Sequence, residues 1–326
     1  MTVKLQSIRM SEPLIITDTP ESVNGMPNLG QNSTWQSISY RDWNGPIKET
    51  WEAIGGNAEI MPMVRPGLKQ WQQIMILDSS PISQVDGLRI MLQSGKSPPT
   101  PFACIAITGD GFHGNRGRPW HALEGNLHLT TLFSPNRSAN EMGIGLSIVP
   151  SLAVVDALDH FEGLRKKSKI KWVNDVLIDG KKVSGVITST LTKSQNVEHA
   201  IFGIGVNIAA TPLLTESKFV QVPTCLRETA PDTLITQQVF LPVLLESLIK
   251  RHKQLLDHGP KPLLSDYISY SCVIGRNVEI WEEHDNQNLA PKILGRGNVE
   301  NILQDLSIKL KNQPKPIQRG RLIFVN

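Results

Sequence analysis

The chain contains 326 residues with a formal net charge of +3, and 40% of its residues are hydrophobic and 19% charged. This composition excludes a disordered or collagen-like chain, the length suggests about two domains, and the small charge predicts no nucleic-acid partner. Neither a signal-peptide pattern nor an apolar run near the roughly 18 residues of a membrane helix is evident, which predicts a cytoplasmic protein without a membrane partner.

Residues 1–62 are rich in Ser, Thr, Asn, Pro and Gly, with only short periodic stretches such as residues 47–54. Acidic residues slightly outnumber basic ones, and no basic helix follows a tight turn. This segment therefore predicts an N-terminal extension, serving as a packing arm or partner surface, rather than a DNA-binding head.

Residues 63–268 alternate between strand and helix patterns, which predicts one main globular domain. The first strand, residues 73–77, ends at Asp78-Ser79-Ser80. Further strands are expected at residues 103–107, 127–133 and 200–208, and helices at residues 142–161 and 241–255, the second ending at Gly259-Pro260. Hairpins are mixed with crossovers, so we expect an α+β fold, a mixed β-sheet packed with helices, rather than a doubly wound parallel sheet.

Residues 269–326 change to short alternating strands separated by polar turns. The strands are expected at residues 277–281, 293–299, 306–310 and 321–325. So short a segment has a marginal core of its own, so we expect a small barrel-like domain that packs on the main one.

Residues 171–187 carry the densest group of polar side chains. Residues 171–178 and 182–188 are predicted as two strands, and Asp179-Gly180 favours a hairpin turn between them. The turn would bring Lys171, Asn174, Asp175 and Lys182 close to Gly185, where the backbone is open to approach. This pattern indicates an anionic ligand, although a surface hairpin with solvated lysines is the simpler alternative.

The loop at residues 109–120 has four glycines and two arginines between two expected strands. Glycines let backbone N–H groups face a phosphate, and Arg116 and Arg118 can donate in pairs to it, although many such loops are only mobile connections. Trp120 is expected to anchor the end of the loop in the core. Gly203, Gly205 and Asn207 predict the floor of a ligand slot on the next long strand.

Two other features were weighed. Ser79 and Ser80 could hydrogen-bond a small neutral ring system, but capping of the next helix is favoured slightly over this. The three cysteines are far apart and the histidines form no metal-binding pattern, so no zinc site and no disulfide framework are expected.

The combination of these segments resembles biotin protein ligases from about residue 70 to 326. It consists of Lys171-Trp172-Val173-Asn174-Asp175, Lys182, Gly185, Gly203-x-Gly205-x-Asn207 and an Arg-Gly-Arg-x-Trp loop. The resemblance implies a catalytic domain related to lipoate ligases and octanoyl transferases, followed by an SH3-like β-barrel domain. It also implies ATP-dependent formation of biotinyl-AMP and transfer of biotin to a lysine of a biotin carboxyl carrier-type protein, with Mg²⁺ and with a homodimer as one expected assembly.

The resemblance also implies a role for each matching residue. It places Lys182, Arg116 and Arg118 in catalysis, and Asp175 beside a Mg²⁺ ion held by ATP. The nucleotide site would contain Lys171, Asn174, Asp175 and Asn207, and the acyl or biotin site Ser79, Ser80, Gly114, Asn115, Gly185, Gly203 and Gly205.

The chain departs from the family pattern mainly in the glycine-rich loop. Two arginine positions are occupied by His113 and Asn115, and a pocket glutamine by Gly109; Pro81 and Val173 are further departures. The nucleotide side therefore matches better than the biotin side. Two alternatives stay open: a ligase for another acyl acid such as lipoate or octanoate, and a binding or regulatory paralogue with weakened catalysis.

Overall fold

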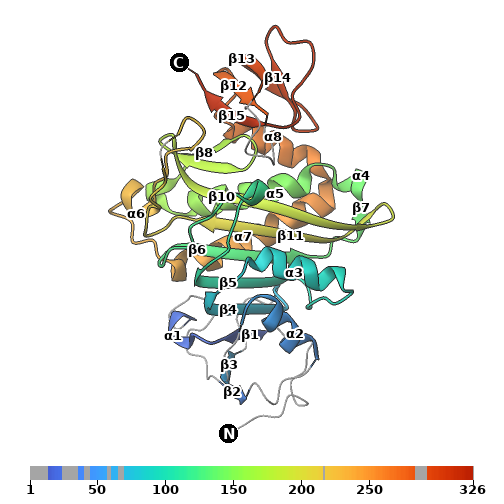
Figure 1. The fold of residues 1–326 in the computed structure, drawn as a ribbon, viewed down its shortest axis with the longest axis vertical. Helices are drawn as coiled ribbons and strands as arrows, with labels where there is room; N and C mark the ends of the chain where they lie inside the picture. Colours follow the sequence, from blue (N-terminus) through green and yellow to red (C-terminus); the bar gives the residue numbers. More distant parts are fainter. Residues whose placement is uncertain are drawn as a thin grey trace.

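The computed structural model describes residues 14–23, 36–39, 45–56, 60–64, 70–215, 217–282 and 292–325. In this part of the chain, eleven strands form one mixed sheet and four form a smaller one (Figure 1). The large sheet has the order β2-β3-β1-β4-β5-β6-β11-β10-β9-β8, and β7 pairs with β11 beside this path. Its strands are β1 (Leu14–Thr17), β2 (Gln36–Ser39), β3 (Ile60–Val64), β4 (Gln73–Ser80), β5 (Phe102–Gly109), β6 (Leu127–Phe133), β7 (Arg137–Ser138), β8 (Ser168–Lys171), β9 (Asp175–Ile178), β10 (Lys181–Lys193) and β11 (Asn196–Val206).

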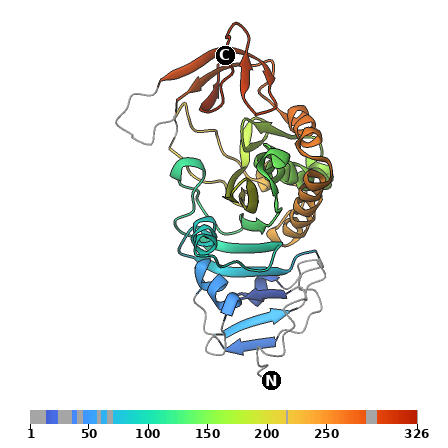
Figure 2. The ribbon, with the colours of Figure 1, turned by 90° about the vertical axis from the view of Figure 1, so that its right-hand side faces the viewer.

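Helices cover both faces of the large sheet. Figure 2 shows α7 and α8 on one side of it. The helices are α1 (Pro20–Val23), α2 (Gly45–Ala53), α3 (Gln84–Gln93), α4 (Ala139–Met142), α5 (Gly145–His160), α6 (Leu226–Thr229), α7 (Gln237–His258) and α8 (Pro260–Tyr270), with 3₁₀ turns at Asn115–Gly117 and Glu162–Leu164. The expected α+β class, a mixed sheet packed with helices, is confirmed.

Strands β1 to β3 extend the large sheet beyond β4. Strand β1 runs parallel to β4 and antiparallel to β3, and the expected periodic stretch at residues 47–54 is helical in α2. The side chains of Ile47 and Trp51 are buried beneath α2 and join a core with Met75 and Leu77 of β4. The division of the chain at residue 62 stays a prediction.

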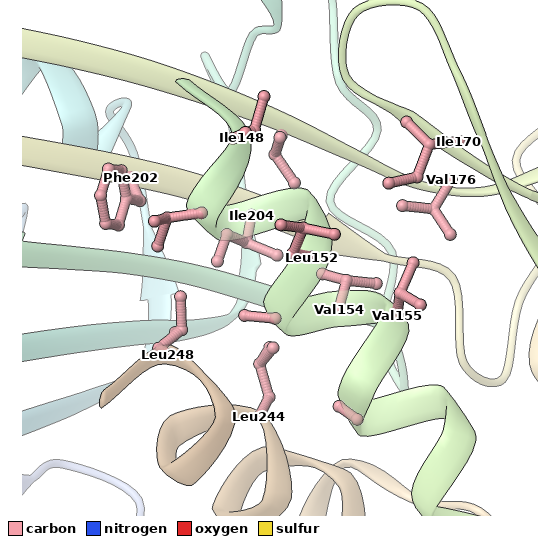
Figure 3. Close-up of a cluster of buried hydrophobic side chains, with 14 of the residues drawn as sticks. Ile148, Leu152, Val154, Val155, Ile170, Val176, Phe202, Ile204, Leu244 and Leu248 are labelled. Atoms are coloured by element: carbon pink, nitrogen blue, oxygen red, sulfur yellow. The ribbon is translucent and has the colours of Figure 1, made fainter. Parts of the chain in front are cut away.

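Helix α5 lies in the centre of the main core. Ile148 and Leu152 of α5 lie among Phe202 and Ile204 of β11 and Leu244 of α7 (Figure 3). The stretch Ala139–His160 is long and apolar enough to cross a membrane by length and composition, but 72% of its most apolar window is buried inside the fold. No such run was expected from the sequence. A helix buried all round is apolar all round, so its composition reflects packing between the sheet and α7.

Helix α3 covers the opposite face, and the sequence analysis expected a helix here without giving its range. It begins after Ser83, whose hydroxyl accepts a hydrogen bond from the Asp86 backbone N–H at 3.4 Å. The expected capping by Ser79 or Ser80 is therefore wrong. Ser79 is exposed, and Ser80 ends β4 with its hydroxyl donating to the Ile54 carbonyl at 2.8 Å.

The segment at residues 171–188 forms three strands, so the prediction of two was wrong. Strand β8 ends at Lys171, and the chain reverses at once to begin β9 at Asp175, with these two residues paired. The second reversal is the predicted one: Asp179 and Gly180 have φ of +50° and +75°. Two successive positive φ values are typical of the tight hairpin turn that Asp-Gly favours.

A small β domain follows α8 at the C-terminal end of the described chain. Its strands have the order β14-β13-β12-β15, namely β14 (Ile308–Leu310), β13 (Ile293–Ile302), β12 (Asn277–Trp281) and β15 (Arg321–Phe324). The Trp172 indole donates to the Leu306 carbonyl at 2.7 Å, and the Cys272 N–H donates to the Ile170 carbonyl at 3.0 Å. The small domain thus packs on the large sheet, as expected for a chain segment with little core of its own.

Candidate functional site

The register of the large sheet aligns a row of residues across six strands on the face that carries α3. Cross-strand partners point to the same face of a sheet, so their side chains lie together. The odd-numbered positions of β11 face this side, whereas Phe202 and Ile204 face the main core. From β5 to β8 the row reads Ala106, His128, Gly205, Gly185, Asp175 and Lys171.

A β-bulge in β10 adds Lys182 to this row. The register with β9 shifts between Lys182 and Ser184, so Val183 is an extra residue on β10. Residues three apart on a regular strand face opposite sides, and the bulge reverses this. A Cβ atom on Gly185 would lie 3.0 Å from the Lys182 amine, which places this amine directly over the glycine.

Residues 222–224 hold the bulged strand from its other side. The Lys182 N–H donates to the Val222 carbonyl at 2.7 Å, and the Thr224 N–H donates to the Lys182 carbonyl at 2.9 Å. These bonds replace ladder bonds that the bulge disrupts. The position of Lys182 therefore depends on a segment about 40 residues later in the chain.

Lys182 and Asp175 form an ion pair of 2.6 Å, with about a quarter of each side chain exposed (26% and 24%). Burial alone would raise the pKa of the Asp175 carboxyl, but the positive charges of Lys182, Lys171 and Arg118 outweigh it and lower this pKa. Asp175 is therefore ionised near neutral pH. Three cations around one carboxylate leave a local excess of positive charge, which suits a phosphate-bearing ligand.

Lys171 lies at the boundary with the C-terminal domain. Its amine donates to the Gln221 side-chain carbonyl at 2.9 Å and lies 5.6 Å from the centre of the Phe324 ring. Burial lowers its pKa, and the charges of Lys182 and Arg321 add to this lowering while Asp175 opposes it. A buried cation beside other cations is stabilised by an arriving anion.

Asn174 and Asn207 both use their amide N–H groups within the protein. The Asn174 amide donates to the Val186 carbonyl and holds the β8–β9 turn against β10. The Asn207 amide donates to the Thr224 carbonyl at 3.0 Å, whereas its side-chain oxygen is buried without a hydrogen-bond partner. Such a buried oxygen is costly to leave unpaired, so an N–H donor that reached it would be bound favourably.

The Trp120 indole covers the glycines of the row rather than entering a core. Added Cβ atoms would lie 2.2 Å from it at Gly205 and 3.3 Å from it at Gly185. The Lys182 amine lies 5.7 Å from the ring centre. The half-buried indole thus lies over Gly205 and beside the Lys182 amine, which itself covers Gly185.

The loop before Trp120 is folded and tied to α3. The Gly114 N–H donates to the Arg118 carbonyl at 2.7 Å, and the Arg118 guanidinium donates to the Asn115 carbonyl at 3.0 Å. His113 contacts the Asp86 carboxylate at 2.6 Å, and this hydrogen bond raises the pKa of His113. Arg116 has a φ of +57° and, like Arg118, is exposed. The loop thus presents two guanidinium groups, one of them close enough to Asp175 to lower its pKa.

Some predicted acyl-site residues have protein side chains as near neighbours. An added Cβ on Gly203 would lie 2.8 Å from both Ile187 and Val85, so this glycine admits α3 to the sheet. At Gly109, where the family has a glutamine, the Phe112 ring lies 2.4 Å from such an atom.

Two residues of the site were missed by the sequence analysis. His128 is 2% exposed and lies in the row beside Gly205, and Gln221 holds Lys171. His128 could have been found, because it alternates with leucines on a predicted strand and so had to face one side of the sheet. Gln221 gave no signal, since its partner is 50 residues away.

Comparisons with known proteins show which family and which fold this chain is similar to. The sequence model of the biotin/lipoate A/B protein ligase family matches residues 94–207. The bifunctional ligase/repressor BirA of Bacillus subtilis is 29% identical over 166 residues, covering 51% of this chain and 50% of that protein. A biotin–acetyl-CoA-carboxylase ligase of Paracoccus denitrificans is 28% identical over 165 residues, covering 51% of this chain and 68% of that protein. The chain thus spans about half the length of the first of these relatives.

Solved structures show the same fold over a longer stretch. The biotin protein ligase from Aquifex aeolicus in complex with biotin and ATP has a TM-score of 0.59 at 21% identity, covering 77% of this chain and 98% of that chain. The apo structure of that ligase has a TM-score of 0.55 at 20% identity, with coverage of 77% and 98%. Residues 94–207, which supply the bulged strand, the glycine floor and the arginine loop, therefore match the sequence model of the biotin/lipoate A/B protein ligase family, and the chain is similar in fold to biotin protein ligases.

Proposed function

We propose that the chain is an ATP-dependent ligase that joins biotin to a lysine of a biotin carboxyl carrier-type protein. The observation that carries this proposal is the bulge that places the Lys182 amine beside Asp175 and over Gly185. It fixes a positive charge beside the half-buried Trp120 indole that lies against Gly205 and Gly185, and a carboxylate and a phosphate would meet at this charge. The names of the relatives, a ligase for acetyl-CoA carboxylase among them, support the same activity.

In the first step, a biotin carboxylate oxygen attacks the α-phosphorus of ATP. A new phosphorus–oxygen bond forms, the bond to the β-phosphate oxygen breaks, and pyrophosphate leaves. Negative charge builds on the phosphate oxygens, and Lys182, with Arg116 and Arg118, stabilises it by position rather than by proton transfer. Asp175 holds the Lys182 amine in place through their 2.6 Å ion pair.

In the second step, the neutral amine of the carrier lysine attacks the acyl carbon. The carbon–oxygen bond to AMP breaks, AMP leaves with the electron pair, and the amine releases one proton. The unpaired oxygen of Asn207 would accept from an N–H group of the nucleotide, and Lys171 would offset phosphate charge from the far end of the row. Both steps need the acid and the nucleotide held end to end, which the row of residues allows.

The residues of this site fit a Mg²⁺ ion only if the ion is bound together with ATP. In the described ranges, no group of three His, Cys, Asp or Glu side chains could hold a metal ion. Mg²⁺ commonly keeps water and substrate phosphates as most of its ligands and needs one or two protein carboxylates. Asp175 would be such a ligand, and the ion would neutralise charge on the leaving phosphates.

A pyrophosphate-release assay tests the proposal. The protein is supplied with ATP and, in turn, biotin, lipoate or octanoate. Lys182→Ala is expected to lower the rate about 10²- to 10³-fold, the usual loss for one preorganised charge. Lys181→Ala is the matched control, because Lys181 is the exposed neighbour and its loss removes the same charge. No pyrophosphate with any of the three acids, from a folded protein, would refute an enzymatic role.

Two specific observations favour alternatives. Phe112 occupies the space at Gly109, which supports a ligase for a different acid such as lipoate or octanoate, and preference for such an acid in the same assay would select it. Asn115 and His113 stand at arginine positions, which supports a weakened binding or regulatory paralogue; an ordinary rate of carrier biotinylation excludes it.

Four other expectations stay predictions: a cytoplasmic location, a homodimer, absence of nucleic-acid binding, and domain limits at residues 62 and 268.

A further inference from the structure

His128 makes two hydrogen bonds that define its protonation. The Trp120 indole N–H donates to His128 Nδ1 at 3.2 Å, and His128 Nε2 contacts the Leu123 carbonyl at 3.1 Å. An indole can only donate and a carbonyl can only accept, so Nδ1 is bare and Nε2 carries the proton. Burial lowers the pKa of His128 to about 4, and the ring is therefore neutral at physiological pH.

Because His128 lies beside the two glycines that Trp120 covers, its hydrogen bond to Trp120 affects how the indole lies over them. His128 is the cross-strand partner of Gly205, which in turn pairs with Gly185. The Trp120 indole spans from His128 across both glycines. An indole tethered at its nitrogen has a fixed tilt, whereas an untethered one can swing on its two side-chain torsions.

We propose that His128 is a positioning residue that fixes the shape of the acyl-acid pocket by holding Trp120 across Gly205 and Gly185. The inference rests on the proposed function, because it concerns the same pocket. A fixed indole wall suits a rigid ring acid, and a mobile wall would also admit flexible straight-chain acids. His128 itself need not touch the substrate.

Two substitutions separate the hydrogen bond to Trp120 from the rest of the side chain. His128→Asn keeps an acceptor near the Nδ1 position and loses the contact with Leu123. His128→Gln keeps a donor near the Nε2 position and loses the acceptor for the indole. Both remove the imidazole, so a simple loss of packing would affect them alike.

The first readout is the indole N–H resonance of Trp120, assigned with Trp120→Phe among the seven tryptophans of the chain. His128→Asn is expected to keep the wild-type shift and slow hydrogen exchange, and His128→Gln to lose both. The second readout is kinetic: His128→Gln should raise the KM for biotin, and lower the preference for biotin over octanoate, by roughly 2- to 10-fold. The KM for ATP should stay constant in both variants.

Equal indole spectra in the two variants would overturn the inference. So would an equal change in the KM values for biotin and ATP, which indicates a general loss of structure. A wild-type protein without turnover would instead refute the proposed function. The indole resonances would then still decide whether His128 holds Trp120, so the two failures are distinguishable.

Discussion

Replacing Gly205 with alanine tests whether the indole lies on the glycine floor. The new Cβ would lie 2.2 Å from Cζ2 of Trp120, and ordinary contact begins at 3.4 Å, so the ring must retreat by about 1.2 Å (3.4 minus 2.2). Overpacking of this kind costs about 1–3 kcal/mol. The retreat also strains the hydrogen bond to His128, which is worth about 1 kcal/mol. We expect a loss of about 2 kcal/mol in the free energy of unfolding.

The comparison is with Gly185→Ala, one strand away. There the nearest atoms are the amine and Cε of Lys182 at 3.0 and 3.1 Å, the end of a flexible side chain that can move. We expect under about 1 kcal/mol of destabilisation, but a slower first chemical step because the amine is displaced.

Urea unfolding of a double-mutant cycle measures the contact. In a Trp120→Ala background the ring that Gly205→Ala would strike is absent, so its penalty should fall below about 0.5 kcal/mol. An equal penalty in both backgrounds would show that Trp120 does not rest on Gly205, and the interpretation of the floor would be wrong.

Three further predictions follow from buried or paired charges. Arg251→Met should cost about 3–5 kcal/mol in urea unfolding, because Arg251 is 7% exposed and bonds Asp156 through two nitrogens at 2.7 Å; a loss below about 1 kcal/mol would contradict this. His128 has a pKa of about 4 in the folded state, against an ordinary value of 6.5. As the pH falls below 6.5, the unfolded state therefore takes up a proton that the folded state does not. Stability that is fully present above pH 6.5 is lost as the pH falls to 4. His128→Asn should remove up to roughly 3 kcal/mol of that pH dependence, and an unchanged curve would disprove it. Trp281→Leu should lower the free energy of unfolding by about 1 kcal/mol, because it removes the cation–π contact with the Lys218 amine, which lies 3.7 Å from the ring centre. In the Trp281→Leu background, Lys218→Met should cause no further loss.

The sequence predicted those strands, turns and helices whose formation depends on residues close together in the chain. The alternation in residues 127–133 became β6, and the Asp179-Gly180 pair became the expected turn, because both depend on neighbouring residues. The apolar repeat of residues 241–255 became part of α7. Helix α8 was not predicted, because the pair Gly259-Pro260 indicates the end of a helix. Proline is well placed in the first turn of a helix, so the same pair also begins the next one.

The candidate site was predictable in its components but not in its geometry. Lys182 and Gly185 were identified together, but their common face depends on the bulge at Val183. That bulge is stabilised by bonds from Val222 and Thr224, which no local pattern connects with it. No local pattern predicts the hydrogen bond from Trp120 to His128 either, because the loop and β6 must both be folded before the two side chains meet.

The departures of the glycine-rich loop from the family pattern are compensated inside the fold. His113 does not leave a gap where an arginine is expected, because it contacts Asp86 of α3 at 2.6 Å. Phe112 fills the space above Gly109 and lies 5.9 Å from the His128 ring. Protein contacts thus replace side chains that would otherwise reach the ligand, and they do so only at the acid end of the row. At the nucleotide end, Lys182 and Asp175 keep a charged arrangement. The proposal of a changed or reshaped acid pocket is consistent with this division, because Lys182 and Asp175 keep the charged pair that the proposed first step needs.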